Sequence, residues 1–181
     1  MIVFFGPPGA GKSVQGQLLA AKYGWRWLGI GQLLRDTHEL ELIKKMQAGD
    51  MVDLVKVNKL VEKALMEAGR ITHIVIDGFP RQLAQAQWLI ELQSRLQRKI
   101  NLVIVLEVSD TELLERLRLR GRVDDTSEAI QERLNLYNQE VTPVLDYFIE
   151  QNIKIAHING EGTIDQIHQR ILEEIEKCKL A

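Results

Sequence analysis

The sequence predicts an α/β fold in which a parallel sheet carries helices on both faces. Two observations lead to this prediction. Short apolar runs, typical of buried strands, alternate with longer segments whose apolar residues recur at helical spacing. In addition, the first apolar run, Ile2–Phe5, leads directly into the glycine-rich residues 6–13, and a helical pattern follows. A strand, a glycine loop and a helix in this order are typical of a phosphate-binding loop.

The first part of the chain is predicted to contain two more strands after the one at its start. The expected elements are a helix after Ser13, a strand over 25–30, helices from 31, over 39–48 and from 53 to 69, and a strand over 71–77. Apolar side chains at helical spacing define the helix that ends at Gly69, and Asp53 is a suitable residue to cap its start. Residues 78–80 then form a predicted turn.

The remainder of the chain continues the alternation. A helix precedes the most apolar stretch, residues 100–108, which is expected to be a central strand. Ser109 and Glu112 have the spacing of a capping box, and so do Thr163 and Gln166. Between these boxes we expect a long helix after residue 125, with a kink or a restart at Pro143, and a last strand over 153–158.

Length and composition point to a single compact domain. The chain has 181 residues, a formal net charge of −2 and no low-complexity linker, so we expect a single domain and a monomer. A duplex nucleic-acid partner is not expected, since such domains are strongly basic. Cys178 is the single cysteine, which excludes an internal disulfide and a cysteine-based zinc site. The sequence has no apolar run of membrane-spanning length and no secretory signal, so a cytoplasmic location is expected.

The glycine-rich residues 6–13 match the pattern G-x-x-x-x-G-K-[ST]. Gly6, Gly9 and Gly11 allow backbone conformations in which N–H groups point at phosphate oxygens. The start of the next helix adds partial positive charge at the same place. Lys12 reaches the β- and γ-phosphates, and the Ser13 hydroxyl faces Mg²⁺. The expected ligand is therefore a nucleoside triphosphate with its magnesium ion.

Phosphoryl transfer requires positioning and neutralisation of charge, for which the planar fork of arginine is well suited. The chain offers six arginines near the predicted loops and helix ends: Arg35, Arg81, Arg116, Arg120, Arg122 and Arg133. Asp77 follows a predicted strand and could orient Mg²⁺ through water, or it could simply cap a turn. Asp124 and Asp125 could cap a helix, anchor neighbouring arginines, or do both.

Several motifs now agree with one another. They are the phosphate loop, then Gly31-Gln32-Leu33-Leu34-Arg35, then Asp77-Gly78-Phe79-Pro80-Arg81 with Gln85-Ala86, then Gly121-Arg122-Val123-Asp124-Asp125 with Arg133. In this order and at these separations the chain resembles adenylate kinase and related nucleoside monophosphate kinases over nearly its whole length. The resemblance implies transfer of the γ-phosphoryl group of ATP to a nucleoside monophosphate with Mg²⁺.

The resemblance also implies roles for individual residues. The ATP site would comprise Gly6, Gly9, Ala10, Gly11, Lys12, Ser13, Val14, Arg116 and Arg120. The monophosphate site would comprise Gly31, Arg35, Val57, Gly78, Arg81, Gln85, Arg122 and Arg133, with Gln85 reading adenine. Catalysis would rest on Lys12, Arg81, Arg120, Arg122 and Arg133. Ser13 and Asp77 would serve Mg²⁺.

Four departures from the family pattern keep other functions open. Ser13-Val14 stands where the family has Gly-Thr, and Ile30-Gly31-Gln32 where it has Ser/Thr-Gly-Asp. Val52-Asp53 replaces Val-Pro, and only Gly121 separates Arg120 from Arg122. We therefore expect a P-loop kinase with a helical monophosphate-binding arm at about 29–58 and a vestigial lid at about 120–125. AMP is the predicted acceptor. The alternatives are UMP, CMP or a deoxynucleotide, or a nucleotide-binding regulatory protein with weak or no transfer.

Overall fold

The structure of the protein is a computed structural model, which describes residues 1–38, 54–71, 73–121 and 126–180. Three expectations lie outside these residues: the helix over 39–48 and the caps at Asp53 and Asp125. Much of the expected arm and most of the expected lid also lie outside them.

Within the described residues, five strands form one sheet. They are β1 (Ile2–Phe5), β2 (Arg26–Gly29), β3 (Ile74–Asp77), β4 (Leu102–Glu107) and β5 (Ile155–Asn159). Their order is β2-β3-β1-β4-β5 and every neighbouring pair is parallel, which confirms the predicted sheet. The apolar stretch expected to be central forms β4, which lies inside the sheet between β1 and β5, while β1 occupies the middle.

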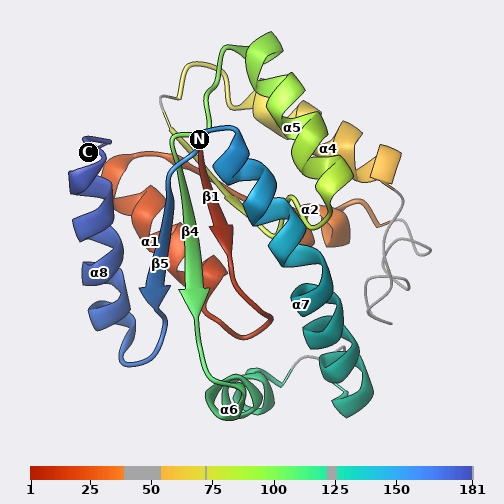
Figure 1. The fold of residues 1–181 in the computed structure, drawn as a ribbon, viewed down its shortest axis with the longest axis vertical. Coiled ribbons are helices and arrows are strands. Elements are labelled where there is room, and N and C mark those ends of the chain that lie inside the picture. Colours follow the sequence, from red (N-terminus) through yellow and green to blue (C-terminus); the bar gives the residue numbers. More distant parts are fainter. Residues whose placement is uncertain (39–53, 72, 122–125, 181) are drawn as a thin grey trace.

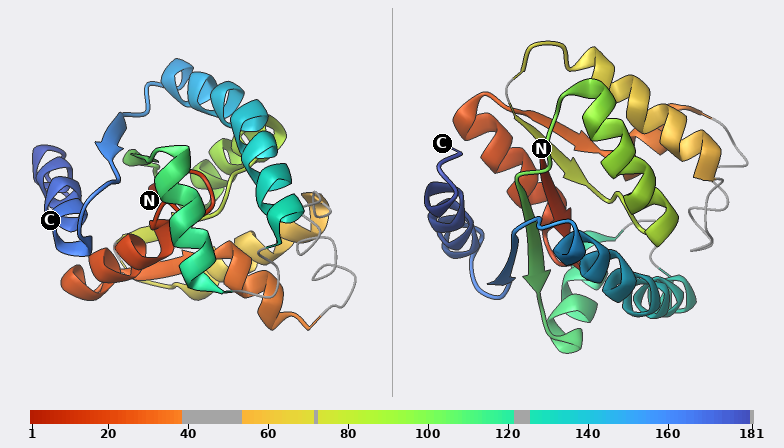
Figure 2. Two further views of the ribbon diagram at one scale, coloured as in Figure 1. Left: turned by 90° about the horizontal axis from the view of Figure 1, so that it is seen from below. Right: turned by 45° about the horizontal axis from the view of Figure 1, so that its top comes forward.

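Helices cover both faces of this sheet. They are α1 (Lys12–Tyr23), α2 (Ile30–Asp36), α4 (Leu54–Glu67), α5 (Leu83–Leu96), α6 (Asp110–Arg120), α7 (Ser127–Glu150) and α8 (Ile164–Lys177). Helices α1 and α8 lie on one side of the strands, and α4, α5 and α7 lie on the other (Figures 1 and 2). Helix α6 lies beyond the arrowheads of the strands, at the edge of the sheet where their carboxyl ends meet (Figure 1).

Two hydrophobic cores, one on each face, hold the layers together. Alternate residues of β1 enter different cores: Ile2 and Phe4 pack on the side of α1 and α8, and Val3 and Phe5 on the side of α5 and α7. All four are buried, as expected for a central parallel strand with both faces covered. Across the second core Phe5 meets Phe148 of α7 edge to face, with ring centroids 6.2 Å apart.

Of the two capping boxes expected at helix starts, the structure contains one. The capping box of Thr163 and Gln166 is present at the start of α8. The one expected for Ser109 and Glu112 is wrong, because the Ser109 side chain makes no capping hydrogen bond. Glu112 instead accepts a hydrogen bond from Nε of Arg116, one turn along the helix, at 2.7 Å. Helix α7 runs from Ser127 to Glu150 through Pro143, so the helix does not restart there.

Candidate active site

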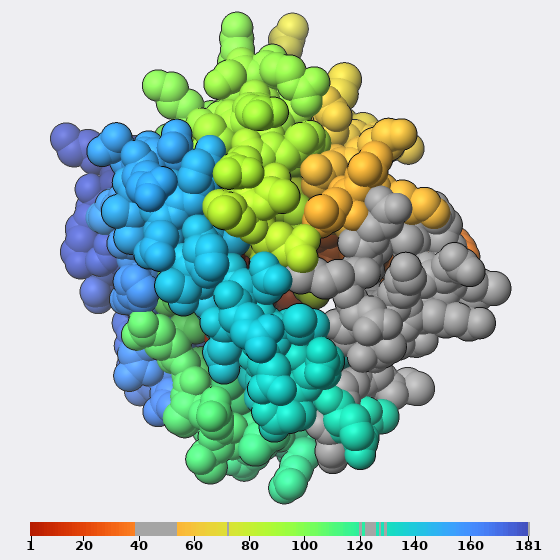
Figure 3. Space-filling model, turned by 45° about the vertical axis from the view of Figure 1, so that its right-hand side comes forward, coloured from red at the N-terminus to blue at the C-terminus, as the bar shows by residue number. Residues whose placement is uncertain are grey.

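A cleft of about 670 Å³ opens at the carboxyl ends of the strands. Open α/β sheets characteristically bind ligands at this edge. In the space-filling view an opening lies between α4, α5 and α7, and atoms from the first part of the chain are visible at its floor (Figure 3). The cleft is lined by most of the residues expected from sequence: Gly6, Gly9, Gly11, Lys12, Ser13, Val14, Gly31, Arg35, Val57, Asp77, Gly78, Arg81, Gln85, Arg116 and Arg133.

The phosphate loop joins β1 to α1 and has the backbone that its glycines allow. Gly9 and Gly11 have φ angles of +88° and +94°, which residues with a Cβ rarely adopt. A Cβ at Gly9 would also lie 3.1 Å from Cγ of Leu117 in α6. The ammonium of Lys12 donates to the carbonyl oxygens of Gly6 at 2.6 Å and Pro7 at 2.9 Å, so it caps the loop. Ala10, also expected in the ATP site, is fully buried and does not line the cleft, and its backbone N–H donates to the carbonyl oxygen of Pro7 at 3.1 Å.

Ser13, at the start of α1, and Asp77, at the end of β3, meet in the cleft. The Ser13 hydroxyl donates to Oδ2 of Asp77 at 2.5 Å. Asp77 ends β3 and is 5% exposed, so its carboxylate is a buried acceptor beside the phosphate loop. A hydroxyl and a carboxylate supply hard oxygen ligands, directly or through water, of the kind that Mg²⁺ prefers. The residues present therefore fit a magnesium ion bound with a triphosphate.

Arg81 and Arg133 bring two positive charges to the same part of the cleft. The pKa of Arg81 lies below its usual value because the cleft walls partly desolvate its guanidinium, although the side chain stays open to solvent. The charge of Asp77 raises this pKa and the charge of Arg133 lowers it. Two cations held close together repel each other, so this arrangement favours an anionic ligand between them.

Two polar contacts line the part of the cleft formed by α2 and the turn after β3. Gln85 is 5% exposed, and its Oε1 accepts a hydrogen bond from the backbone N–H of Arg81 at 2.7 Å. The backbone amide fixes which end of the side chain is oxygen, so the NH₂ group of Gln85 is left to donate to another partner. Arg35 donates from Nη2 to Oε1 of Gln32 at 2.8 Å on the same helix, α2.

Three further arginines were expected in the site, Arg116 before the lid and Arg120 and Arg122 within it, and not all of them are described. Arg116 lines the cleft and donates from Nη2 to the carbonyl oxygen of Gly160 at 2.9 Å. Arg120 is the last residue of α6, and Gly121 follows it in the left-handed region with φ +59°. Arg122 lies outside the described residues. The structure thus brings Lys12, Arg35, Arg81, Arg116 and Arg133 to one cleft.

Several residues of the cleft were not expected from the sequence, and three of them have aromatic or buried polar side chains. Tyr137 of α7 lines it, and burial together with the charge of Glu107 raises its pKa to about 12. Trp27 of β2 also lines it, with its indole packed so closely that a Cβ at Gly29 would lie 2.3 Å from its Cζ2. Gln15 of α1 is 2% exposed. A polar residue one turn after the phosphate-loop lysine was a signal for Gln15, but nothing in the sequence identified the other two.

Across residues 1–38, 54–71, 73–121 and 126–180, no three histidine, cysteine or acidic side chains are grouped to hold a metal ion. Among the helices in those same ranges, none has both the length and the apolar character needed to cross a membrane.

Comparison with known proteins identifies the family. The sequence matches the family model described as adenylate kinase over residues 4–153. It is 39% identical over 177 residues to an adenylate kinase of Mycolicibacterium paratuberculosis, covering 94% of this chain and 96% of that protein. It is 37% identical over 180 residues to one of Prochlorococcus marinus (96% and 97% covered) and 35% over 184 residues to one of Leptospira biflexa (96% and 98% covered). The chain, with its phosphate loop and convergent arginines, therefore belongs to the adenylate kinase family of nucleoside monophosphate kinases.

Proposed function

We propose that the protein transfers the γ-phosphoryl group of ATP to AMP and so forms two molecules of ADP. The observation that carries this proposal is the joint presence in one cleft of Lys12, Asp77 and the arginine pair Arg81 and Arg133. Phosphoryl transfer depends on positioning and on neutralising the charge of the transferring group, and these side chains supply both.

The donor nucleotide occupies the side of the cleft formed by the phosphate loop. Backbone N–H groups of the non-proline residues in 6–13 hold its β- and γ-phosphates, with Lys12 beside them. Arg116 lies against the base and Arg120 neutralises the phosphates. Val14 offers no side-chain hydrogen bond, so one side-chain contact to the phosphates that the family has is missing here. The proposed magnesium ion, served by Ser13 and Asp77, would neutralise charge on the donor's phosphates.

The acceptor occupies the side formed by α2, α4 and the turn after β3. Arg35 and Arg81 hold its phosphate, and Gly31, Val57 and Gly78 border its nucleoside. The NH₂ group of Gln85 donates to N1 of adenine, and Oε1, already bonded to Arg81, keeps a second lone pair for the exocyclic amine. Arg122 and Arg133 complete the neutralisation of the transferring group.

At the level of the whole chain we propose one domain over 1–181. Its monophosphate-binding arm spans about 29–58, and a short lid spans about 120–125. We further propose that the protein acts as a cytoplasmic monomer. ATP and AMP are its partners.

The test is an ADP-forming coupled assay with MgATP and a panel of acceptors: AMP, UMP, CMP, GMP and the deoxynucleotides. The expected result is a kcat/KM for AMP above that for every other acceptor. Initial rates with UMP or CMP that exceed the rate with AMP would overturn the assignment of AMP. ATP binding without transfer to any acceptor would favour a regulatory nucleotide-binding role instead.

A further inference from the structure

Gln15 connects the phosphate-loop helix to the far side of the cleft. It lies in the first turn of α1, and its side chain is 2% exposed. Its Nε2 donates to the carbonyl oxygen of Ile164 at 2.9 Å, and its Oε1 lies 3.1 Å from Nδ1 of His168. Ile164 and His168 belong to α8, which lies on the same face of the sheet as α1 (Figure 1). A buried amide thus joins the starts of two helices that are distant in sequence.

The direction of these hydrogen bonds is determined by the backbone. A carbonyl oxygen can only accept, so the NH₂ group of Gln15 must face Ile164 and its oxygen must face His168. Nδ1 of His168 must then carry a hydrogen, which it does in one neutral tautomer and in the protonated ring. The link from Gln15 to α8 therefore holds in both charge states of His168.

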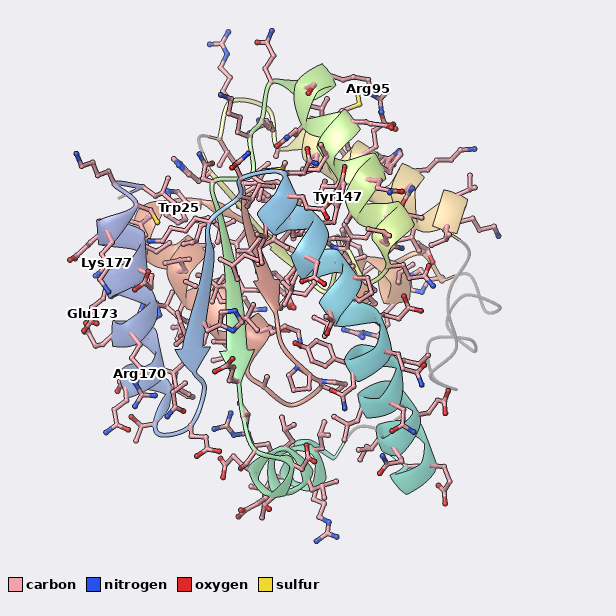
Figure 4. The ribbon with its side chains drawn as sticks, in the orientation of Figure 1. Trp25, Arg95, Tyr147, Arg170, Glu173 and Lys177 are labelled. Atoms are coloured by element: carbon pink, nitrogen blue, oxygen red, sulfur yellow. The ribbon has the colours of Figure 1, made fainter. Side chains whose placement is uncertain are left out.

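The segment that Gln15 reaches, residues 159–164, forms one wall of the cleft through Gly162 and Ile164. Other elements hold this segment as well. Arg116 of α6 donates to the carbonyl oxygen of Gly160, and Arg170 of α8 donates to those of Asn159 and Glu161, both at 2.7 Å. Arg170 lies on α8 toward its amino-terminal end, near this segment (Figure 4).

A further contact comes from the turn before α6. The backbone N–H of Ser109 donates to Oε1 of Glu161 at 3.0 Å, and hydrogen bonds from Ser109 lower the pKa of that carboxyl. Hydrogen bonds from α6, from the residue before it and from α8 therefore fix the wall formed by residues 159–164. The hydrogen bond from Gln15 connects this wall to α1, the helix that begins at the phosphate loop.

We propose that Gln15 is a positioning residue for the donor nucleotide. It sets the spacing between the phosphate loop, which holds the triphosphate, and the wall at 159–164, which with Arg116 flanks the base. A nucleotide held at both ends is sensitive to that spacing, because a misplacement of about 1 Å is enough to weaken its contacts severely. The inference rests on the proposed function, since it assumes that the donor's phosphates lie on the phosphate loop.

Three variants separate the contacts. Gln15→Leu removes both hydrogen bonds at similar volume, and Gln15→Glu retains an acceptor for His168 but cannot donate to Ile164. His168→Phe is the matched control, because it removes only the bond to the imidazole. Calorimetric titration with ATP in the absence of AMP should show a Kd raised about tenfold for both Gln15 variants, because both lose the hydrogen bond to Ile164 that sets the spacing. His168→Phe should stay within about twofold of wild type, and so should AMP binding to all variants.

Inorganic tripolyphosphate is the discriminating probe, because it has no base and reaches only the phosphate loop. Its Kd should be the same in wild type and in the Gln15 variants. The proposal is overturned if tripolyphosphate or AMP loses as much affinity as ATP, or if ATP binding does not change. If Gln15→Leu does not fold, Gln15→Glu decides by the same criteria. Because every readout is binding, failure of the proposed transfer reaction would show separately, as ATP binding without turnover.

Discussion

The hydroxyl of Ser13 donates a hydrogen bond of 2.5 Å to the carboxylate of Asp77, and so joins the end of the phosphate loop to the end of β3. Asp77→Asn keeps the shape of this pair but removes its charge. We expect transfer to fall about 100-fold or more and the Mg²⁺ concentration for half-maximal rate to rise, because a neutral amide holds a hydrated cation poorly. The measurement is the initial rate across a magnesium titration. Ser13→Thr, which retains the hydroxyl, is the control, and an unchanged magnesium dependence in Asp77→Asn would contradict the assignment.

Lys12 is expected to contribute most to the transition state. Its ammonium rests on the carbonyl oxygens of Gly6 and Pro7, within the loop that would hold the phosphates. Lys12→Met should lower kcat by about 10²–10³-fold while the protein stays folded, because charge stabilisation is lost where charge redistributes. Lys63→Met on α4 is the matched control, since that side chain is 73% exposed. Wild-type turnover in a folded Lys12→Met protein would reject the catalytic role.

Gln85 is expected to have two separable roles. Gln85→Leu removes the acceptor for the N–H of Arg81 and leaves that group unpaired, which costs about 1–3 kcal/mol of folding free energy. Gln85→Glu keeps the acceptor but loses the NH₂ donor. We expect both variants to raise KM for AMP but not for ATP, and only Gln85→Leu to lower the thermal midpoint. Steady-state kinetics and thermal denaturation measure the two effects, and an unchanged KM for AMP in Gln85→Glu would remove Gln85 from base recognition.

The single residue between Arg120 and Arg122 predicts an imperfectly closed site. The segment from Arg120 to Arg122 spans only about 7 Å when extended, too little for a separate flap. A more exposed site has a higher effective dielectric and admits water as a competing acceptor. We expect measurable hydrolysis of ATP in the absence of AMP, and slower transfer than in relatives with a full lid. The measurement is ATP loss with and without AMP. Rapid transfer with no hydrolysis would mean that another segment closes the site.

His168 should make stability sensitive to mild acid. Burial, followed by the charge of Lys22, lowers its pKa below the ordinary value of 6.5, while Asp165 acts in the opposite direction. The unfolded chain therefore binds a proton at a higher pH than the folded protein does. This contribution to stability is complete above about pH 6.5 and is lost as pH falls toward the folded pKa. The thermal midpoint of wild type should drop more between pH 7.5 and 5.5 than that of His168→Phe. Equal drops would show that other groups account for the acid sensitivity.

Patterns confined to neighbouring residues were readable from the sequence. The phosphate loop follows from eight consecutive residues, and the cap at Thr163 and Gln166 from four, because the interactions that form them are local. The parallel sheet follows from the alternation of strands and helices, and the sheet edge then collects the residues that follow each strand.

Contacts between segments that are distant in the sequence could not be predicted from local patterns. Gln15 is buried because Ile164 and His168 offer it partners across the gap between two helices. Trp27 fits the wall of the cleft because Gly16 and Gly29 have no side chains, a relation that spans two elements. The box expected at Ser109 failed for a related reason: the backbone N–H of Ser109, which the glutamate of a capping box would accept, donates instead to Glu161 from the segment after β5.

The position of β1 in the sheet has a consequence for how the protein is made. Ile2 is paired with Val75 on one side and Leu102 on the other, so both neighbours of the first strand are translated long after it. Until β4 has left the ribosome, at least one edge of the apolar strand β1 therefore has unpaired backbone groups. Such an exposed edge favours aggregation or chaperone binding.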